Sequence, residues 1–220
     1  MVIYHFDFGS QREFIPVYLQ AMKNTLLLSV VSVVLATIVG IIAGLARTSK
    51  RPFIAWPVAV YIEVIRGTPL LLQIMIFYFG IGPIINLPAW TAAILSLTLF
   101  AGAYVAEIVR AGIQSINRGQ TEAALSLGLS HVQTMRFVIL PQALRRILPP
   151  LAGQFISLIK DSSLVSVLAI SELVYTARKI NTRTLKSLEG YVIVGAIYFV
   201  MTFSLSRLAG YLERRSSPSD

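Results

Sequence analysis

The chain has 220 residues, of which 55% are hydrophobic and only 13% are charged. Soluble domains carry about 25% charged residues, so this composition excludes an ordinary soluble protein and predicts an integral membrane protein. The net charge of +9 would favour nucleic-acid binding in a soluble protein. Here we assign it to lysines and arginines that flank membrane spans and meet anionic lipid, and we expect no nucleic-acid partner. Cysteine is absent, which excludes disulfides and thiolate chemistry.

Residues 1–18 contain no basic segment followed by a small-residue cleavage site. We therefore expect no cleaved signal peptide, and the first span acts as its own insertion signal. Five apolar stretches follow, each long enough to cross about 30 Å of hydrocarbon. The predicted fold is all-α and polytopic, with about five transmembrane helices in a membrane domain over 22–212. The predicted spans are 22–46, 57–80, 90–113, 146–170 and 190–212.

The distribution of lysine and arginine predicts how these spans are oriented. Basic residues cluster between the first and second spans, between the third and fourth, and after the fifth, whereas residues 81–90 carry no charge. Under the positive-inside rule, 1–21 is an external N-terminal segment and 213–220 is a cytoplasmic tail. The clustered residues are Arg47, Lys50, Arg51, Arg118, Arg136, Arg145, Arg146, Arg214 and Arg215.

The segment 171–189 departs from this rule, because it holds four basic residues against two glutamates and yet is external in the same topology. Its charge faces either an external protein partner or the headgroups at the membrane interface, and both alternatives remain open. The residues concerned are Arg178, Lys179, Arg183, Lys186, Glu172 and Glu189.

Helix-breaking residues fall inside two predicted spans. Gly67 and Pro69 interrupt the second span, and Pro149-Pro150 interrupts the start of the fourth. Non-helical backbone at membrane depth is tolerated only against protein or a water-filled cavity, so these breaks favour helices that line a pathway. Kinked packing of the helices is the alternative.

Ionisable side chains inside a span cost about 2.5–3.5 kcal/mol each on insertion, so each needs a reason. Glu63 and Arg66 are three residues apart on one helix face, and so are Glu107 and Arg110. Each pair is expected to neutralise itself locally or to cross-pair between helices. We interpret them as ion pairs that fix helix packing or frame an inner gate.

Lys160 and Asp161 lie near mid-depth of the fourth predicted span. Adjacent helical residues diverge by about 100°, so the two side chains do not simply face each other. A diverging cation and anion suit the carboxylate and ammonium groups of an amino acid, and an ion pair to another helix or subunit is the alternative. Gln154 and Tyr104 are further candidate contacts along the pathway.

The polar segment 119–141 lies between the third and fourth spans and predicts two short helices with a hinge. Thr121 is the predicted N-cap of the first helix, and Gly128 ends it in the left-handed region. Ser130 and Gln133 have capping-box spacing and start the second helix, which Leu140-Pro141 is expected to stop. The segment also has a surface of little side-chain bulk, formed by Ala123, Ala124 and Gly128.

This segment resembles the EAA loop of permease subunits of bacterial ABC importers, through Glu-Ala-Ala at 122–124, Gly128 and Val-Ile-Leu-Pro at 138–141. The resemblance implies a cytoplasmic coupling helix that docks onto a separate ATPase subunit. An ordinary helical hairpin between two spans is the alternative. The implied coupling residues are Glu122, Ala123, Ala124, Gly128 and His131.

Three further segments, at 63–73, 103–110 and 160–164, resemble the polar amino acid branch of these permeases. The branch serves substrates of the histidine, arginine, glutamine and cystine type, and the resemblance extends from about residue 20 to 212. It implies a bacterial cytoplasmic membrane location and ATP-binding-cassette subunits that hold ATP and Mg. It also implies a second permease copy or sister permease, and an external substrate-binding protein.

The chain contains no Gly-x-x-x-x-Gly-Lys-Ser/Thr phosphate loop and no plausible nucleophile–base set. We therefore expect a subunit that is not an enzyme, with no metal site and no cofactor of its own. The alternative functions are a permease for another small solute, a self-contained channel or secondary transporter, and a structural membrane protein without a pathway.

Overall fold

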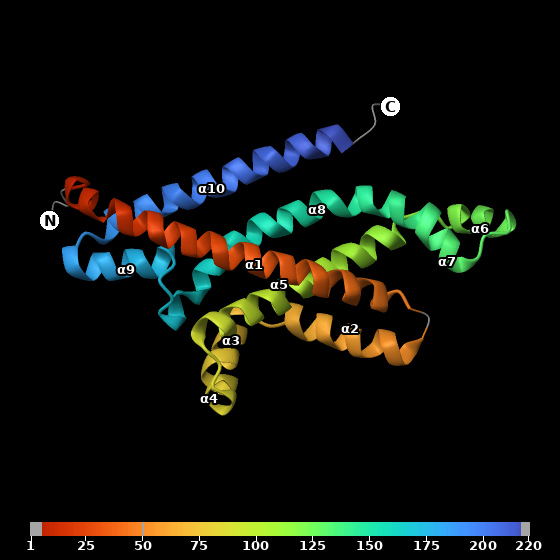
Figure 1. Cartoon of the computed structure of the whole chain (residues 1–220), viewed down its shortest axis with the longest axis horizontal. Coiled ribbons are helices and arrows are strands. Elements are labelled where there is room, and N and C mark those ends of the chain that lie inside the picture. Colours follow the sequence, from red (N-terminus) through yellow and green to blue (C-terminus); the bar gives the residue numbers. More distant parts are fainter. Residues whose placement is uncertain (1–5, 50, 217–220) are drawn as a thin grey trace. The chain divides into compact units, whose positions relative to one another are not determined.

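The computed structural model describes residues 6–49 and 51–216, and within these ranges the regular structure is helical throughout (Figure 1). Short 3₁₀-helices cover Gly9–Phe14 and Ser162–Leu168, and π-helical turns cover Ile76–Ile81 and Met135–Ile139. The start of the predicted N-terminal segment, 1–5, and the end of the predicted tail, 217–220, lie outside the described residues. The α-helices are α1 (Ile15–Arg47), α2 (Pro52–Arg66), α3 (Leu70–Met75), α4 (Gly82–Ile85), α5 (Ala89–Gln114), α6 (Arg118–Ser126), α7 (His131–Thr134), α8 (Leu140–Asp161), α9 (Leu173–Thr184) and α10 (Ser187–Ser216).

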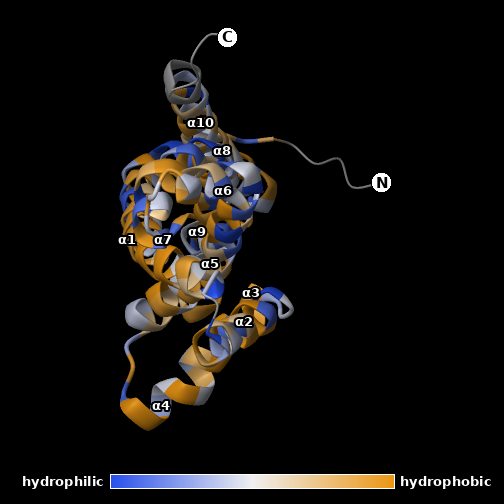
Figure 2. Cartoon of the chain, turned by 90° about the vertical axis from the view of Figure 1, so that its right-hand side faces the viewer, coloured by the Kyte–Doolittle hydropathy of each residue, from blue (hydrophilic) through white to orange (hydrophobic). Residues whose placement is uncertain are grey.

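Four helical runs in the described residues are long and apolar enough to cross a membrane, and a fifth span results if a bent helix pair counts as one. Hydrophobic residues dominate these long helices (Figure 2). The predicted all-α, polytopic fold is confirmed, although the helices extend past the predicted span limits at residues 22 and 146. The four runs are Gly9–Arg47, Ala89–Gln114, His131–Leu168 and Ser187–Tyr211.

The second predicted span, 57–80, is not one continuous helix. Residues 67–69 separate α2 from α3. The helices on either side are long and apolar enough to cross a membrane only when they are taken together as one bent pair, that is, as a broken span or a re-entrant loop. The Gly67 N–H donates to the Glu63 carbonyl at 2.8 Å, which closes the end of α2. The predicted interruption at Gly67 and Pro69 is therefore confirmed.

The predicted interruption at Pro149-Pro150 is wrong, because α8 is helical across both prolines. An interior proline removes one intrahelical hydrogen bond and its ring crowds the carbonyl four residues earlier, so a helix persists across it only where packing offsets that cost. Both prolines are exposed, whereas Ile147 on the same helix is buried in a hydrophobic core. This packing outweighs the local cost of the two prolines.

The predicted helix end at Leu140-Pro141 is also wrong. A π-helical turn over Met135–Ile139 comes directly before it, and the Leu140 N–H donates to the Met135 carbonyl. A π-turn takes in one extra residue, and the changed register relieves the clash that a proline ring makes with the preceding turn. The helix that begins at His131 therefore continues into α8.

The chain divides into two compact units, which we describe separately. The first comprises 1–32, 70–97 and 157–205, and the second comprises 33–69, 98–156 and 206–220. Tyr18, Ala21, Ile159, Leu173, Ala177, Ile180, Val194 and Met201 form the core of the first unit. Val105, Val109, Ile113, Ile116, Ile139, Ala143 and Ile147 form a core of the second.

Within the second unit, α1 and α5 approach closely through glycines spaced four residues apart. A Cβ atom added at Gly40 would overlap the Val105 side chain, and one added at Gly44 would lie 2.7 Å from Val109. Small residues at this spacing let helix backbones approach each other in membranes, where van der Waals contact replaces the hydrophobic effect as the source of attraction. These glycines therefore position α1 against α5.

We expect Gly40→Ala to destabilise the protein by about 1–3 kcal/mol, because the new methyl group overpacks the contact with Val105. Gly153→Ala is the matched control: this helical glycine has no atom within 4 Å of its added Cβ. Alanine at position 153 should raise the free energy of unfolding by about 0.5–1 kcal/mol through its higher helix propensity. Thermal unfolding in detergent measures both, and equal midpoints for the two variants would contradict close packing at Gly40.

Candidate functional site

The loop at 119–141 belongs to the second unit and begins with α6. The side chain of Asn117 caps this helix by accepting a hydrogen bond from the Gly119 N–H at 2.8 Å. The predicted cap at Thr121 is wrong, because the helix already begins at Arg118 and places Thr121 in its first turns. Asparagine is among the best N-cap residues, so the earlier start is favourable.

Gly128 provides the hinge that the sequence predicts. Its φ angle is +85°, which is the left-handed region that favours glycine, and no atom lies within 4 Å of an added Cβ. The capping box that follows is confirmed. The Ser130 N–H donates to Gln133 Oε1 at 2.8 Å, and the Gln133 N–H donates to Ser130 Oγ at 3.3 Å.

The predicted surface of small residues is present only in part. Ala124 is 4% exposed and packs inward, whereas Ala123 and Gly128 are exposed. Two large apolar side chains lie beside the hinge in the open: Leu127 is 84% exposed and Val132 is 76% exposed. Exposed apolar side chains beside a hinge are available for contact with another protein. Glu122 and His131 are exposed on the same loop.

Arg66, Glu107 and Arg110 of the second unit form one connected group of charges. Glu107 forms an ion pair with Arg110 one turn along α5, where Arg110 Nε donates at 2.9 Å. Arg66 on α2 approaches Glu107 at 3.9 Å, so Glu107 is shared between two helices. The Arg66 guanidinium also lies over the Tyr104 ring, 5.3 Å from its centroid.

These contacts decide between the two alternatives for Arg66. In the described residues it cross-pairs with Glu107 on α5 and not with Glu63 on its own helix. Tyr104 lies under the Arg66 cation, and its role as a wall of the pathway stays a prediction. The arrangement ties α2 to α5 by charge and by a cation–π contact, which agrees with ion pairs that fix helix packing.

Lys160 and Asp161 lie at the end of α8, in the first unit. Lys160 lines a cavity of about 290 Å³, whose wall also contains Ser163, Tyr191 and Tyr198. Asp161 is half-buried and does not line this cavity. Neither has a hydrogen bond or an ion pair to its side chain within residues 6–49 and 51–216.

Gln154 also lies on α8, where it is half-buried and belongs to the second unit. No hydrogen bond of its side chain is present in the described part of the chain. Gln154 therefore does not form part of the cavity at Lys160. In the same described residues, no group of three metal-ligating side chains is placed to hold an ion.

Glu172, which the sequence places among the charges of the segment 171–189, is buried. Its side chain is fully buried and caps α9, accepting hydrogen bonds from the Tyr175 N–H at 2.6 Å and the Val174 N–H at 2.9 Å. The Tyr198 hydroxyl donates to the same carboxylate at 3.3 Å. Burial raises the pKa of Glu172, and the backbone donors oppose that shift. In the sequence, the signal for this capping role is the position of Glu172 directly before a helical stretch.

Comparisons with known proteins agree with the fold. The model of the family described as "Binding-protein-dependent transport system inner membrane component" matches residues 36–218. The probable glutamine ABC transporter permease protein GlnP of Bacillus subtilis (strain 168) is 42% identical over 200 residues, which cover 88% of this chain and 90% of the relative. The glutamine transport system permease protein GlnP of Escherichia coli (strain K12) is 40% identical over 213 residues, covering 96% and 97%.

Among solved structures, a chain of an amino acid ABC transporter, described as a crystal structure "with histidines", matches with a TM-score of 0.92 at 42% sequence identity. The match covers 96% of this chain and 100% of that chain. Similarity of this extent in sequence and fold includes the long helices and the loop between α5 and α8. The chain therefore belongs to the family of inner membrane components of binding-protein-dependent transport systems, and it is a multi-pass membrane protein.

Proposed function

We propose that this chain is the membrane subunit of an ATP-driven importer for a polar amino acid. It lines the translocation pathway, while a separate ATP-binding-cassette subunit binds ATP and Mg and hydrolyses the nucleotide. The loop at 119–141 carries this proposal. It offers the exposed apolar side chains of Leu127 and Val132 beside a capped hinge, which supports docking of another protein there.

The substrate class rests on the relatives. Two of them are named as glutamine permeases, and the matching solved structure is described as an amino acid transporter with histidines. Glutamine and histidine differ in side chain but share the α-carboxylate and α-ammonium groups. Lys160 and Asp161 supply opposite charges for these two groups. The lack of a partner for either side chain in the described residues supports a ligand over an ion pair within the chain.

An ion pair with a neighbouring subunit is the second interpretation of Lys160 and Asp161. About five spans are few to enclose a pathway, so we propose that a second copy or a sister permease completes it. An external substrate-binding protein delivers the amino acid, and the N-terminus lies on that side of a bacterial cytoplasmic membrane. The C-terminus and the 119–141 loop then face the ATPase.

The composition of the intact complex tests the proposal as a whole. We expect the detergent-solubilised protein to co-purify with two ATPase subunits and one further permease chain, because the loop has no function without a docking partner. Native mass spectrometry with identification of each subunit is the measurement. A chain that transports amino acids after purification without any ATPase would instead be a channel or secondary transporter.

Leu127→Ser tests the coupling surface. The change removes an exposed apolar contact and should weaken binding of the ATPase by about 1–2 kcal/mol, roughly tenfold, with uptake lowered accordingly. Ile84→Ser is the matched control, since Ile84 is 80% exposed but lies outside the loop. Equal ATPase affinity for the two variants would argue against docking at Leu127. Gly128→Leu is a poorer test, because a side chain at φ +85° strains the hinge itself.

Asp161→Asn tests the substrate contact, because it keeps the size of the side chain and removes its charge. Charge-assisted hydrogen bonds contribute about 1.5–3 kcal/mol, so substrate binding should fall roughly ten- to a hundredfold. Lys160→Met should act similarly on the carboxylate while keeping much of the packing of the stem. Complex yield and uptake are measured together.

The two interpretations differ in whether the single variants and the double variant, Lys160→Met with Asp161→Asn, assemble. If Lys160 and Asp161 contact the substrate, then every variant assembles and none recovers uptake. If each pairs with a neighbouring subunit, a single change leaves a buried charge uncompensated, which costs about 3–5 kcal/mol, and assembly fails. Wild-type uptake in either well-assembled single variant would exclude a role in substrate binding.

A further inference from the structure

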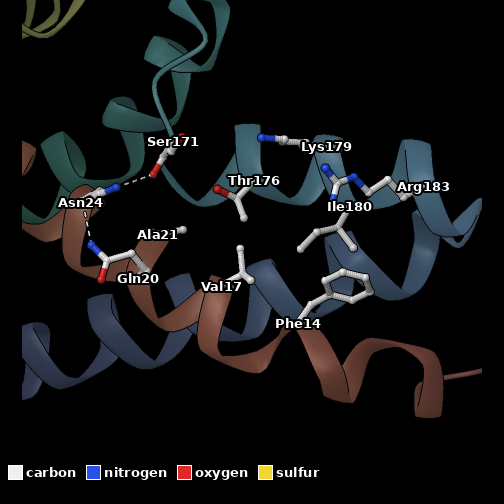
Figure 3. A pocket seen from close by; sticks show the side chains of 10 residues that line it. All are labelled: Phe14, Val17, Gln20, Ala21, Asn24, Ser171, Thr176, Lys179, Ile180 and Arg183. Carbon is white, nitrogen blue, oxygen red and sulfur yellow. Dashed lines mark hydrogen bonds between the residues drawn. The ribbon is translucent and has the colours of Figure 1, made fainter.

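A pocket of about 200 Å³ lies between the N-terminal part of α1 and α9, within the first unit (Figure 3). Gln20, Asn24 and Ser171 form its polar end, where Asn24 Nδ2 donates to the Ser171 carbonyl at 2.8 Å. Phe14 and Ile180 form its apolar end. The helix α9 therefore begins beside Asn24 and runs along α1 toward Phe14.

The charges of α1 indicate which end of the pocket is nearer the membrane. Residues 24–46 carry no charge and are bounded by Lys23 and Arg47, and about 20 apolar residues are enough to cross the hydrocarbon. In the proposed topology, Lys23 lies at the external headgroups and the part of α1 before it projects beyond the membrane. The polar end of the pocket is thus beside the headgroups, and the apolar end at Phe14 faces away from the bilayer.

Apolar side chains are exposed on this projecting part of the chain, where they meet water and not hydrocarbon. Ile15 and Val17 are 53% and 46% exposed, and Val17 lines the pocket. Phe6 and Phe8, which precede them, are 65% and 46% exposed and stack with 6.3 Å between their ring centroids. Apolar groups in this position are available for contact with another protein.

The charge beside the pocket is more positive than the sequence suggests. Of the two acids in the segment 171–189, Glu172 is fully buried against backbone N–H groups. Glu189 is also fully buried and accepts from the Asp7 N–H at 2.9 Å. Asp7 and Glu13 are exposed, but neither lines the pocket. The outer face of α9 is therefore left with its cations.

Lys179 and Arg183 are the cations that line the pocket. Arg178 is already engaged, since it donates to the Ser166 carbonyl at 3.0 Å and lies over the Tyr175 ring. The side chains of Lys179 and Arg183 are exposed and have no hydrogen bond or ion pair within the described ranges 6–49 and 51–216. They are four residues apart on one face of α9, where like charges repel each other, and an anion between them would relieve that repulsion.

We propose that this end of the first unit is the docking surface for an acidic external protein. One carboxylate side chain of that protein enters the pocket between Lys179 and Arg183, and apolar side chains around the carboxylate pack against Ile15 and Val17. The placement rests on the proposed function, which requires an external substrate-binding protein. It adds the surface that this protein contacts and the charge that the protein must present there.

Other occupants would leave part of this surface unused. A phospholipid has its acyl chains in the bilayer, on the side opposite to Phe14. A free anion would satisfy the two cations but would not cover the exposed apolar side chains. A second copy of the chain carries the same cations and would be repelled. An acidic protein uses both features, and it accounts for the departure of the segment 171–189 from the positive-inside rule.

The test measures binding of the amino-acid-binding protein that stimulates ATP hydrolysis by the wild-type complex. The full-length permease and its co-purifying subunits are placed in phosphatidylcholine nanodiscs, and surface plasmon resonance gives the dissociation constant over a range of salt concentrations. Lys179→Gln with Arg183→Gln should weaken binding about tenfold or more at low salt, through the loss of two charge-assisted contacts, and should flatten the salt dependence. Lys179→Arg with Arg183→Lys keeps both charges and should retain the wild-type affinity.

Val17→Ser tests the apolar part of the same surface. It should weaken binding about fivefold, because less apolar area is removed from water, and the salt dependence should stay as in the wild type, since apolar contacts are not screened. Weakening in the charge variant alone, with wild-type affinity for Val17→Ser, would overturn the joint use of cations and apolar groups.

Arg12→Gln with Lys23→Gln is the matched control for charge, because both cations are exposed on the same end of the chain and do not line the pocket. An equal loss of affinity in this control would show a general charge effect and overturn the proposal. Wild-type affinity in the pocket variant would overturn the docking site and leave the proposed function intact. A wild-type complex that transports amino acids without binding any external protein would overturn both.

Discussion

The backbone of a chain this apolar must find its hydrogen-bond partners within the protein, because membrane hydrocarbon offers none. This constraint explains why the described structure is helical and why its helix breaks are closed locally. At residues 67–69 the Gly67 N–H donates to the Glu63 carbonyl, and the Thr68 hydroxyl donates to the Val64 carbonyl at 2.9 Å. A chain under this constraint departs from helix only where nearby groups replace the lost bonds.

The same constraint governs the charged side chains, and the protein meets it in two ways. Glu107 is shared by Arg110 and Arg66, so its charge is neutralised where two helices meet. Glu172 is held by backbone N–H groups at the start of α9, so a helix end stabilises it. Lys160 and Asp161 have neither arrangement in the described residues. A charge that the protein leaves unmatched at this depth is a candidate for function.

Two amphipathic segments provide the polar surfaces of the chain. The loop at 119–141 is polar, yet it exposes Leu127 and Val132, and this combination favours a protein partner. The helix α9 instead buries its apolar face in the core of the first unit and exposes its cations, and this favours an anionic surface. The different placement of apolar and charged residues therefore separates two kinds of interaction within one chain.

Much of this protein follows from its sequence alone. Long apolar stretches predict membrane helices, and short-range chemistry predicts the break at Gly67, the left-handed Gly128 and the capping box at Ser130. These features are local, since each depends on residues within one or two turns. The EAA-type spacing identifies the family for a similar reason, because it lies within one continuous segment.

Other features depend on tertiary structure, because local sequence signals do not specify them. The prolines at 149–150 predict a break, but packing of the same helix in a core keeps it helical. Arg66 lies within reach of Glu63 in sequence, but the fold brings Glu107 to it. Glu172 appears as one surface charge among several until folding buries it at the start of α9. In each case the outcome depends on residues distant in the chain, whose contributions to the free energy of folding exceed the local preference.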